Sequence, residues 1–266
     1  MILIADSGST KTKWGYSEGG VTIIKSVETE GINPVLQTKE TIERILNEVD
    51  FNNVDKVRFY GAGCAECANL QTLINLLKLS AHTDDVTVKS DIVGAAIALF
   101  GTNPGIACIL GTGSNSILWD GTNIVRNIHA GGFILGDEGS GSVLGKWLIS
   151  DFIKGLTPDW LTRILKDEYG LDYFTVIEHV HRQPMPNRWL AQFTKLLGAH
   201  RDDKYVHTLL VNEFCRFFER NVLQYQGYEN LPVGFIGSIA YVFESELREA
   251  AIRYNMNVAK IMKTPF

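Results

Sequence analysis

Short apolar segments separated by small polar turns make up the first part of the chain. Residues 2–5 are apolar and end at a Gly/Ser/Thr turn, and residues 13–17 and 21–27 alternate between apolar and polar side chains. Alternation with a period of two indicates strands, whereas a period of 3.6 indicates helices. We therefore expect strands at 2–5, 13–17, 21–27, 57–60 and 86–89, and helices at 38–49, 66–79 and 92–100.

A similar series begins after the stretch TNPG at residues 102–105, whose composition is typical of a linker. Here we expect strands at 106–110, 116–119 and 123–128, followed by a mostly helical region from 140 to 226 with breaks near Pro158 and Pro184. The last expected elements are a strand at 233–236, a helix at 241–254 and a strand at 258–262.

The two series share a repeat around their first turn. The segment IADSGSTKTKW at residues 4–14 aligns without gaps on ILGTGSNSILW at residues 109–119, so that Gly8 pairs with Gly113. Two hairpins can share such turns by chance, because Gly, Ser and Asp are common turn residues. A duplicated domain explains the repeat and the linker together, and we prefer it.

The repeat predicts a fold of two duplicated domains. Strands that alternate with helices indicate the α/β class. We expect an N-terminal α/β domain at residues 1–102 and a C-terminal α/β domain at residues 103–266. If the domains are equivalent, the turns at Gly8 and Gly113 face a single cleft between them.

Composition narrows the classes of partner. Charged residues make up 21% of the chain, the formal net charge is −5 and no basic run occurs, which disfavours nucleic acid. The longest apolar run, residues 92–100, is too short to cross a bilayer, so no membrane partner is expected. The N-terminus MILIAD has the pattern of a first strand rather than of a signal peptide. Four cysteines are few for this length, and we expect a cytoplasmic protein.

The first glycine turn, DSGSTKT at residues 6–12, is a candidate phosphate site. Small residues expose consecutive backbone N–H groups and let a phosphate approach the chain closely. Asp6, at the end of the first strand, could hold Mg²⁺ through water. The alternative is an ordinary hairpin turn, and the spacing of a Walker A loop is absent. The candidate phosphate-binding residues are Gly8, Ser9, Thr10 and Lys11.

The second glycine turn, GTGSNS at residues 111–116, has the same character. Its candidate phosphate-binding residues are Gly111, Thr112 and Gly113. Two such turns from two duplicated domains would hold a polyphosphate from both sides, and the pair is more specific than either turn alone.

Asp91 is the candidate general base. It stands in the dipeptide Ser90-Asp91 between an expected strand and the apolar helix that follows. A carboxylate held there would be fixed in position and could accept the proton of a substrate hydroxyl. The alternative is plain helix capping, because Ser and Asp are preferred N-cap residues.

The glycine loop, residues 129–142, has the sequence HAGGFILGDEGSGS. Its five glycines suit a backbone that wraps closely around a polar ligand. Asp137 and Glu138 supply carboxyl oxygens for sugar hydroxyls. Helix capping by these two acids is the alternative, but it does not explain Gly131-Gly132 or Gly136.

A pair of cysteines, Cys64 and Cys67, follows an expected strand in the segment GAGCAEC. A metal or redox site would require partners, and no second pair or Cys/His cluster accompanies it. We interpret both as small buried thiols.

These segments together resemble the BadF/BadG/BcrA/BcrD ATPase family, and within it the N-acetylglucosamine kinase-like group, over nearly the whole chain and in the expected order. DSGSTKT resembles the phosphate-1 motif, LGTGSNS the phosphate-2 motif, and GFIGSIA at residues 234–240 the adenosine motif. The resemblance implies the actin/hexokinase/Hsp70 fold: two duplicated ribonuclease H-like domains that flank a nucleotide cleft.

The resemblance also implies roles for individual residues. Thr10 and Thr112 would contact ATP, and Asp91 would be the base. The adenosine pocket would be formed by Gly237, Ser238 and Tyr241. The sugar would be bound by Asn33, Asp91, Ser114, Asn115, Gly131, Gly132 and Asp137. Where animal enzymes of the group often carry a tryptophan after the sugar-binding Asn, this chain has Pro34 and Val35, which leaves the identity of the sugar open.

The expected function is ATP-dependent phosphorylation of an amino sugar. The γ-phosphoryl group of ATP, with Mg²⁺ near Asp6, would pass directly to a sugar hydroxyl. N-acetylglucosamine is favoured, and glucosamine and N-acetylmuramic acid compete with it. One alternative is an ATPase or ATP-sensing module that couples domain closure to a partner protein, and another is a sugar-binding regulator without catalysis. The partner expected is a small-molecule sugar, and a homodimer is left open.

Overall fold

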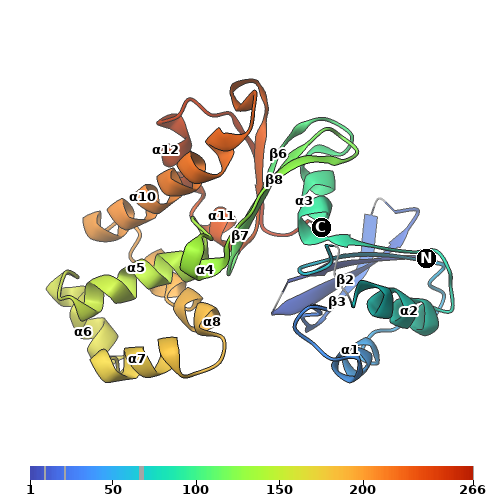
Figure 1. Ribbon diagram of the computed structural model, residues 1–266, viewed down its shortest axis with the longest axis horizontal. Helices are drawn as coiled ribbons and strands as arrows, with labels where there is room; N and C mark the ends of the chain where they lie inside the picture. Colours follow the sequence, from blue (N-terminus) through green and yellow to red (C-terminus); the bar gives the residue numbers. More distant parts are fainter. Residues whose placement is uncertain (9, 21, 66–68, 266) are drawn as a thin grey trace. The chain divides into compact units, whose positions relative to one another are not determined.

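The computed structural model describes residues 1–8, 10–20, 22–65 and 69–265, and it divides into two compact units (Figure 1). Unit 1 comprises Met1–Ala98 together with Pro265, and unit 2 comprises Leu99–Thr264. The division lies inside helix α3 (Asp91–Phe100), four residues before the boundary expected from the linker. Each unit has its own five-stranded sheet.

Unit 1 is a mixed sheet in the order β3-β2-β1-β4-β5. Its strands are β1 (Ile2–Ser7), β2 (Lys11–Glu18), β3 (Thr22–Glu30), β4 (Lys56–Gly61) and β5 (Val86–Ser90), and its helices before α3 are α1 (Lys39–Leu46) and α2 (Leu70–Ala81). Strands β1 to β3 are antiparallel neighbours, and β4 and β5 run parallel to β1. The predicted element starts at residues 21 and 66 lie outside the described residues.

The apolar pattern explains the elements of unit 1. In β1 the side chains of Leu3 and Ala5 are buried in the core, as the alternation requires. Helix α1 begins after Thr38, whose hydroxyl accepts the N–H of Thr41, and its buried face is the predicted apolar stripe. Trp14 of β2 fills the centre of this core.

Unit 2 repeats the topology of unit 1. Its sheet has the order β8-β7-β6-β9-β10, with β6 (Gly105–Leu110), β7 (Ser114–Trp119), β8 (Ile124–Ile128), β9 (Val233–Ile236) and β10 (Val258–Met262). Again the first three strands in sequence are antiparallel and the last two are parallel to the first. The predicted fold class, α/β with two duplicated ribonuclease H-like domains, is confirmed by this agreement.

The residue correspondence between the two first hairpins differs from the gap-free repeat. In unit 1 Ser7 pairs with Thr12, whereas in unit 2 Leu110 pairs with Ser114. The intervening turn is therefore one position longer in unit 1. The offset of the repeat cannot fit both strands, and Gly113 is not the structural equivalent of Gly8, although the strands themselves correspond.

Unit 2 carries the helical region that the sequence predicts. Its helices are α4 (Gly132–Leu135), α5 (Gly141–Ile153), α6 (Asp159–Asp167), α7 (Tyr173–His181), α8 (Pro186–Ala191), α9 (Thr194–Ala199), α10 (Lys204–Arg220), α11 (Ser238–Val242) and α12 (Glu244–Ile252), with short 3-10 turns η1 (Val222–Gln224) and η2 (Tyr228–Asn230). The single helix predicted over 241–254 is instead divided at buried Phe243, whose backbone leaves the helical region.

Helices α5 and α10 form the frame of unit 2. Helix α5 packs against both α8 and α10, and α10 also packs against α12 (Figure 1). Gly145 permits the first contact, because a Cβ there would lie 2.0 Å from the carbonyl oxygen of Leu190. Phe214, Phe217 and Phe218 of α10 are buried in the core. Among the described residues, no helix is long and apolar enough to cross a membrane.

Candidate active site

The first glycine turn closes the β1–β2 hairpin of unit 1. The Gly8 N–H donates to the carbonyl of Lys11 at 3.0 Å, and Thr10 is exposed. The exposed Lys11 ammonium lies 2.9 Å from the carboxylate of Glu28. Ser9, predicted to contact phosphate, lies outside the described residues.

Asp6 and Asp91 bring two carboxyl groups into electrostatic contact within unit 1. Burial raises the pKa of Asp6 to about 6, with a further contribution from the charge of Asp91 and opposition from Lys13 and Lys11. Burial likewise raises the pKa of Asp91 to about 6, against the hydrogen bonds from the backbone N–H groups of Ile92 and of Asp91 itself. The charge of Asp91 thus acts on Asp6, although the two residues are far apart in sequence.

Asp91 follows β5 without a connecting loop and begins α3. Its Oδ1 accepts the N–H of Ile92 at 2.8 Å. An N-cap side chain normally accepts from the residue two or three positions further on. Plain capping therefore does not account for this carboxyl.

The segment that carries Asn33 is docked on the first hairpin by buried hydroxyls. Ser7 Oγ donates to the carbonyl of Ile32 and accepts its N–H, both at 2.9 Å, and Thr12 Oγ1 lies 2.6 Å from Ser7 Oγ. Asn33 is only 8% exposed, and its Oδ1 accepts the N–H of Val35 at 3.0 Å. The amide of Asn33 is thereby held near the strand end that carries Asp6.

Gly63 supports Asn33, and sequence reasoning missed it. Its φ is +75°, and a Cβ on Gly63 would lie 2.2 Å from Oδ1 of Asn33. The signal in the sequence was the segment GAGC, in which Gly61 ends β4 and Gly63 follows two residues later. Cys64 is buried, as interpreted, and Cys67 lies outside the described residues.

The second glycine turn in unit 2 is tied to the start of α5. The N–H groups of Gly141 and Ser142 donate to the carbonyls of Gly111 and Thr112, at 2.8 and 3.1 Å. Helix N-termini leave N–H groups without intrahelical partners, and this turn satisfies two of them. The turn and α5 therefore form one hydrogen-bonded body.

Asp137 joins the glycine loop to the second glycine turn. Its Oδ1 accepts the N–H of Ser114 at 3.2 Å, and burial is the largest cause of its raised pKa. A Cβ on Gly113 would lie 3.0 Å from Oδ2 of Asp137. Ser140, rather than Asp137, caps α5 by accepting the N–H of Val143, so helix capping does not explain Asp137.

Gly113 does not have a positive φ, since it is not among the described glycines with a left-handed backbone. Its requirement for glycine comes instead from the approach of the Asp137 carboxyl.

The remainder of the glycine loop folds on itself. Gly131 and Gly132 have φ values of +76° and +70°, and both are exposed. A Cβ on Gly136 would lie 1.9 Å from the carbonyl oxygen of Ala130, which accepts the N–H of Asp137 at 2.8 Å. The glycines thus permit a tight loop in which Gly131 and Gly132 are exposed.

The two acids of this loop have different partners. The Glu138 carboxylate forms an ion pair with Arg220 at the end of α10, whereas Asp137 contacts the second glycine turn. Asn115, the next candidate sugar residue, accepts the side-chain amide of Asn127 at 2.9 Å. Of the two carboxyls predicted for sugar hydroxyls, Glu138 is engaged in holding the loop to α10.

The segment at residues 234–240, which is the candidate adenosine motif, packs against the end of β6. Gly237 has a φ of +126°, and a Cβ on it would lie 2.2 Å from the carbonyl oxygen of Leu110. Leu110 is the last residue of β6, directly before the second glycine turn. Ser238 and Tyr241 of α11 are exposed, Tyr241 to 51%. Unit 2 thus gathers the second glycine turn, Asp137 and Gly237 at the end of one strand.

Comparison with known proteins identifies the class and then the family. No family model matches the chain, and no curated protein matches it. Two duplicated α/β units of this topology define the actin-like ATPase fold of sugar kinases. The structure of a Porphyromonas gingivalis protein, named as a candidate N-acetylglucosamine kinase, is 41% identical, with a TM-score of 0.95 over 100% of this chain and 95% of its own. The chain belongs to this N-acetylglucosamine kinase-like family.

More distant structures share the fold. A candidate N-acetylglucosamine kinase from Chromobacterium violaceum is 21% identical, with a TM-score of 0.69 over 96% of this chain and 93% of its own. A ROK family glucokinase from Streptomyces griseus, solved with glucose and AMPPNP, is 14% identical, with a TM-score of 0.62 over 98% of this chain and 94% of its own. The BadF/BadG/BcrA/BcrD label and the roles of individual residues stay predictions.

Proposed function

We propose that the protein transfers the γ-phosphoryl group of ATP to a hydroxyl of an amino sugar, most favourably N-acetylglucosamine. The observation that carries the proposal is the bond from the Ser114 N–H to Asp137. It joins a carboxyl suited to sugar hydroxyls to a turn suited to phosphates. A kinase requires both ligands side by side, whereas a simple ATPase has no use for the first.

In this proposal the two glycine turns bind the phosphates of ATP. The hydroxyls of Thr10 and Thr112 would provide neutral donors beside backbone N–H groups, and Lys11 would add a positive charge. The nucleoside would lie against Gly237, Ser238 and Tyr241. Because the net charge of the chain is negative, directional backbone donors rather than a basic surface would hold the nucleotide.

Asp6 is the residue that would hold Mg²⁺, through water. The half-buried carboxyls of Asp6 and Asp91 are oxygen donors of the kind Mg²⁺ prefers. No cluster of three or more His, Cys, Asp or Glu suited to a metal occurs within the described part of the chain. In the proposal the Mg²⁺ ion would be carried mainly by the nucleotide phosphates, whose charge it would neutralise.

Asp91 would accept the proton of the attacking hydroxyl. Its backbone is fixed at the junction of β5 and α3, and its second carboxyl oxygen has no role in the bond to Ile92. Positioning of the hydroxyl against the phosphoryl group would supply most of the rate acceleration. The sugar would be oriented by Asn33, Ser114, Asn115, Gly131, Gly132 and Asp137, together with Asp91.

The test is ADP release with a panel of sugars: N-acetylglucosamine, glucosamine, N-acetylmuramic acid and N-acetylmannosamine, beside a reaction without sugar. We expect ADP release that depends on an amino sugar, matched mole for mole by a sugar phosphate in mass spectrometry. ATP hydrolysis at the same rate with and without every sugar would reject the kinase in favour of an ATPase module.

A further inference from the structure

We propose that Glu213 of α10 is a positioning residue, which sets the place of Asp137 by holding the backbone of the glycine loop at Gly139. The inference rests on the proposed function, because it assigns a task to the loop that is expected to bind sugar. Glu213 itself would touch neither substrate.

Glu213 is a buried carboxyl in the apolar face of a long helix. It is 2% exposed, and its neighbours one position and one turn further along α10 are buried Phe214 and Phe217. An apolar side chain is the expected occupant of such a position. Burial of a carboxyl is costly unless hydrogen bonds compensate, so this residue type requires a specific reason.

The partner of Glu213 is the backbone of the glycine loop. Its Oε1 accepts the N–H of Gly139 at 3.1 Å. Gly139 has a φ of +72°, and a Cβ there would lie 3.0 Å from Cβ of Phe217 and 3.3 Å from Cδ2 of Leu110. The loop backbone is therefore pressed between α10 and the end of β6 at the point where Glu213 binds it.

Asp137 is two residues from this anchor. The Ser140 N–H donates to the carbonyl of Asp137 at 3.1 Å, which makes residues 137–140 a tight turn. Displacement of Gly139 would therefore displace Asp137 and its bond to Ser114. Glu138, between them, is held to Arg220 of the same helix, so α10 anchors two successive residues of the loop.

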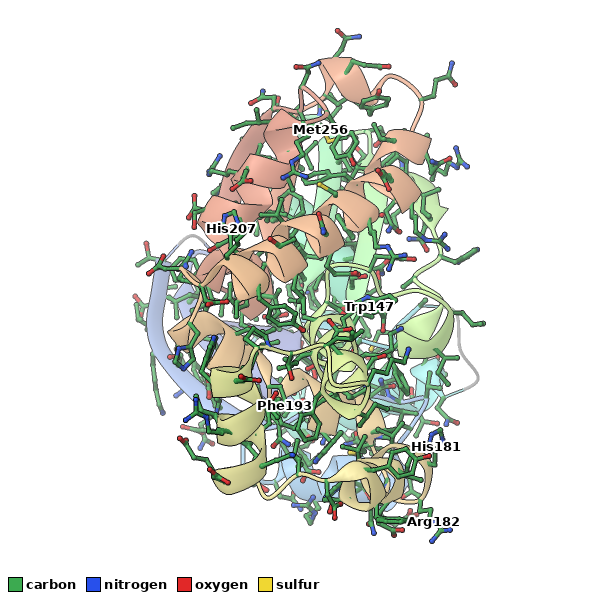
Figure 2. All side chains as sticks on the ribbon, turned by 90° about the vertical axis from the view of Figure 1, so that its left-hand side faces the viewer. Trp147, His181, Arg182, Phe193, His207 and Met256 are labelled. Carbon is green, nitrogen blue, oxygen red and sulfur yellow. The ribbon has the colours of Figure 1, made fainter. Side chains whose placement is uncertain are left out.

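The surroundings of Glu213 are partly charged. Glu138 from the loop and Arg216 from α10 act on it electrostatically, and the Trp147 side chain of α5 contributes a hydrogen bond. Trp147 lies beside α10 in Figure 2, with the guanidinium of Arg216 4.9 Å from its ring centroid. A cavity of about 200 Å³ behind the loop is lined by Glu213 and also by Lys146 and Arg220.

The experiment compares Glu213→Met with Glu213→Gln and with a matched control. Met fills the space but cannot accept the Gly139 N–H, whereas the Gln oxygen can. The control is Glu246→Met, which removes a second buried carboxyl of unit 2, 3% exposed on α12 and bound to Arg201. Among the described residues, the carboxylate of Glu246 is hydrogen-bonded to Arg201 and Ser245 and not to the glycine loop.

For Glu213→Met we expect the KM for the sugar to rise roughly tenfold to hundredfold, the range for loss of a hydrogen bond to a charged group. The KM for ATP should change by less than a factor of about 3. Glu213→Gln should restore the sugar KM to near the wild-type value, and Glu246→Met should leave it unchanged while it lowers the thermal midpoint. An equal rise of the sugar KM in both Met variants, or no rise in a folded Glu213→Met protein, would overturn the proposal.

A second measurement requires no substitution. In the wild-type protein, the NMR chemical shift of the Gly139 amide should change with pH as Glu213 gains or loses its proton. The other charged groups around Glu213 are Arg216, Lys146, Arg220 and Glu138. A Gly139 amide insensitive to pH over the carboxyl range would refute the contact. This result is independent of catalysis: a protein that phosphorylates no sugar in the panel refutes the proposed function, and the titration still decides whether Glu213 holds the loop.

Discussion

Among individual residues, Asp91 allows a structural role as a helix cap to be tested separately from a chemical role as the general base. Its carboxyl accepts the N–H of the next residue, Ile92, which is weak grounds for an N-cap, and its charge raises the pKa of Asp6. A second residue of this kind is Gly63, whose missing side chain leaves room for the amide of Asn33. Asp91 would act through its charge, and Gly63 would act by leaving space for the amide of Asn33, a candidate sugar-binding group.

Asp91→Asn should lower the rate of sugar phosphorylation by roughly two to four orders of magnitude, because it removes the general base. The Asn oxygen can still accept the Ile92 N–H, so the thermal midpoint should stay close to that of the wild type. Sugar-dependent ADP release and a thermal melt measure the two quantities.

The control is Asp172→Asn on α7, where Asp172 accepts the N–H of Thr175 as a true N-cap. This variant should be silent in both measurements, because Asn caps about as well as Asp. A normally active Asp91→Asn enzyme would remove Asp91 from the mechanism and make Asp137 the next carboxyl to test.

Gly63→Ala should weaken sugar binding, because the added methyl group would displace the amide of Asn33 from a position 2.2 Å away. Gly19→Ala is the matched control: Gly19 also has a positive φ, +80°, but a Cβ there meets nothing within 4 Å. Both variants should lose about 1–2 kcal/mol of stability from left-handed strain. Only Gly63→Ala should raise the sugar Kd in calorimetry, and equal sugar affinities would contradict the role given to Gly63.

Among the elements, the second glycine turn, the glycine loop and α5 behave as one unit. The turn carbonyls accept the first N–H groups of α5, and Asp137 accepts the N–H of Ser114. The candidate phosphate and sugar residues of unit 2 therefore share one hydrogen-bonded frame. This coupling was not visible in the sequence, where each segment stood alone.

Gly113→Val should therefore raise the KM for both ATP and sugar, because its side chain would meet the Asp137 carboxyl as well as phosphate space. Gly111→Ala provides the comparison, since a Cβ there meets nothing within 4 Å; it should affect the nucleotide KM only. Initial-rate kinetics with each substrate varied in turn distinguish these outcomes. An unchanged sugar KM in a folded Gly113→Val protein would show that the turn and Asp137 are not coupled.

For the whole molecule, stability depends on two buried carboxyls whose pKa values are shifted in opposite directions. Burial, more than any other cause, raises the pKa of Glu213. Burial also tends to raise the pKa of Glu246. The hydrogen bonds from Arg201, from its own N–H and from Ser245 nevertheless bring that pKa below its ordinary value. The raised group stabilises the fold below the unfolded pKa of about 4.3, and that stability is lost as pH rises through its folded pKa.

Glu213→Gln should consequently gain in thermal midpoint relative to the wild type as pH is raised from about 4 to about 7.5. Glu246→Gln should behave oppositely. The stability that the lowered pKa of Glu246 gives the wild type exists above the unfolded pKa and is lost as pH falls. The thermal midpoint of this variant should therefore be lowest, relative to the wild type, at neutral pH. Thermal melts across this range, with Glu138, Arg216, Lys146 and Arg220 unchanged around Glu213, provide the measurement. Parallel curves for both variants would contradict the assigned shifts.

The sequence by itself determined the class of fold and most elements of both sheets. Strand alternation and helical spacing depend on burial of one face, which is a local property of the pattern. The strand β6 could therefore be located without coordinates, and residues 140–226 could be identified as mostly helical. Turn chemistry likewise located the two glycine turns, and Ser90-Asp91 stood out at a strand end. The gap-free repeat found the duplication but misplaced Gly113, because turn length is set by strand register.

Only the tertiary structure decided which of these segments meet within each unit. Side-chain contacts between residues distant in sequence leave no periodic trace, and so Gly63 beside Asn33, and Glu213 beneath Gly139, could not be predicted. The same reason separated Asp137, which contacts Ser114, from Glu138, which contacts Arg220. Local pattern fixes which face of an element is buried, whereas the partner of each buried polar group depends on how the elements pack.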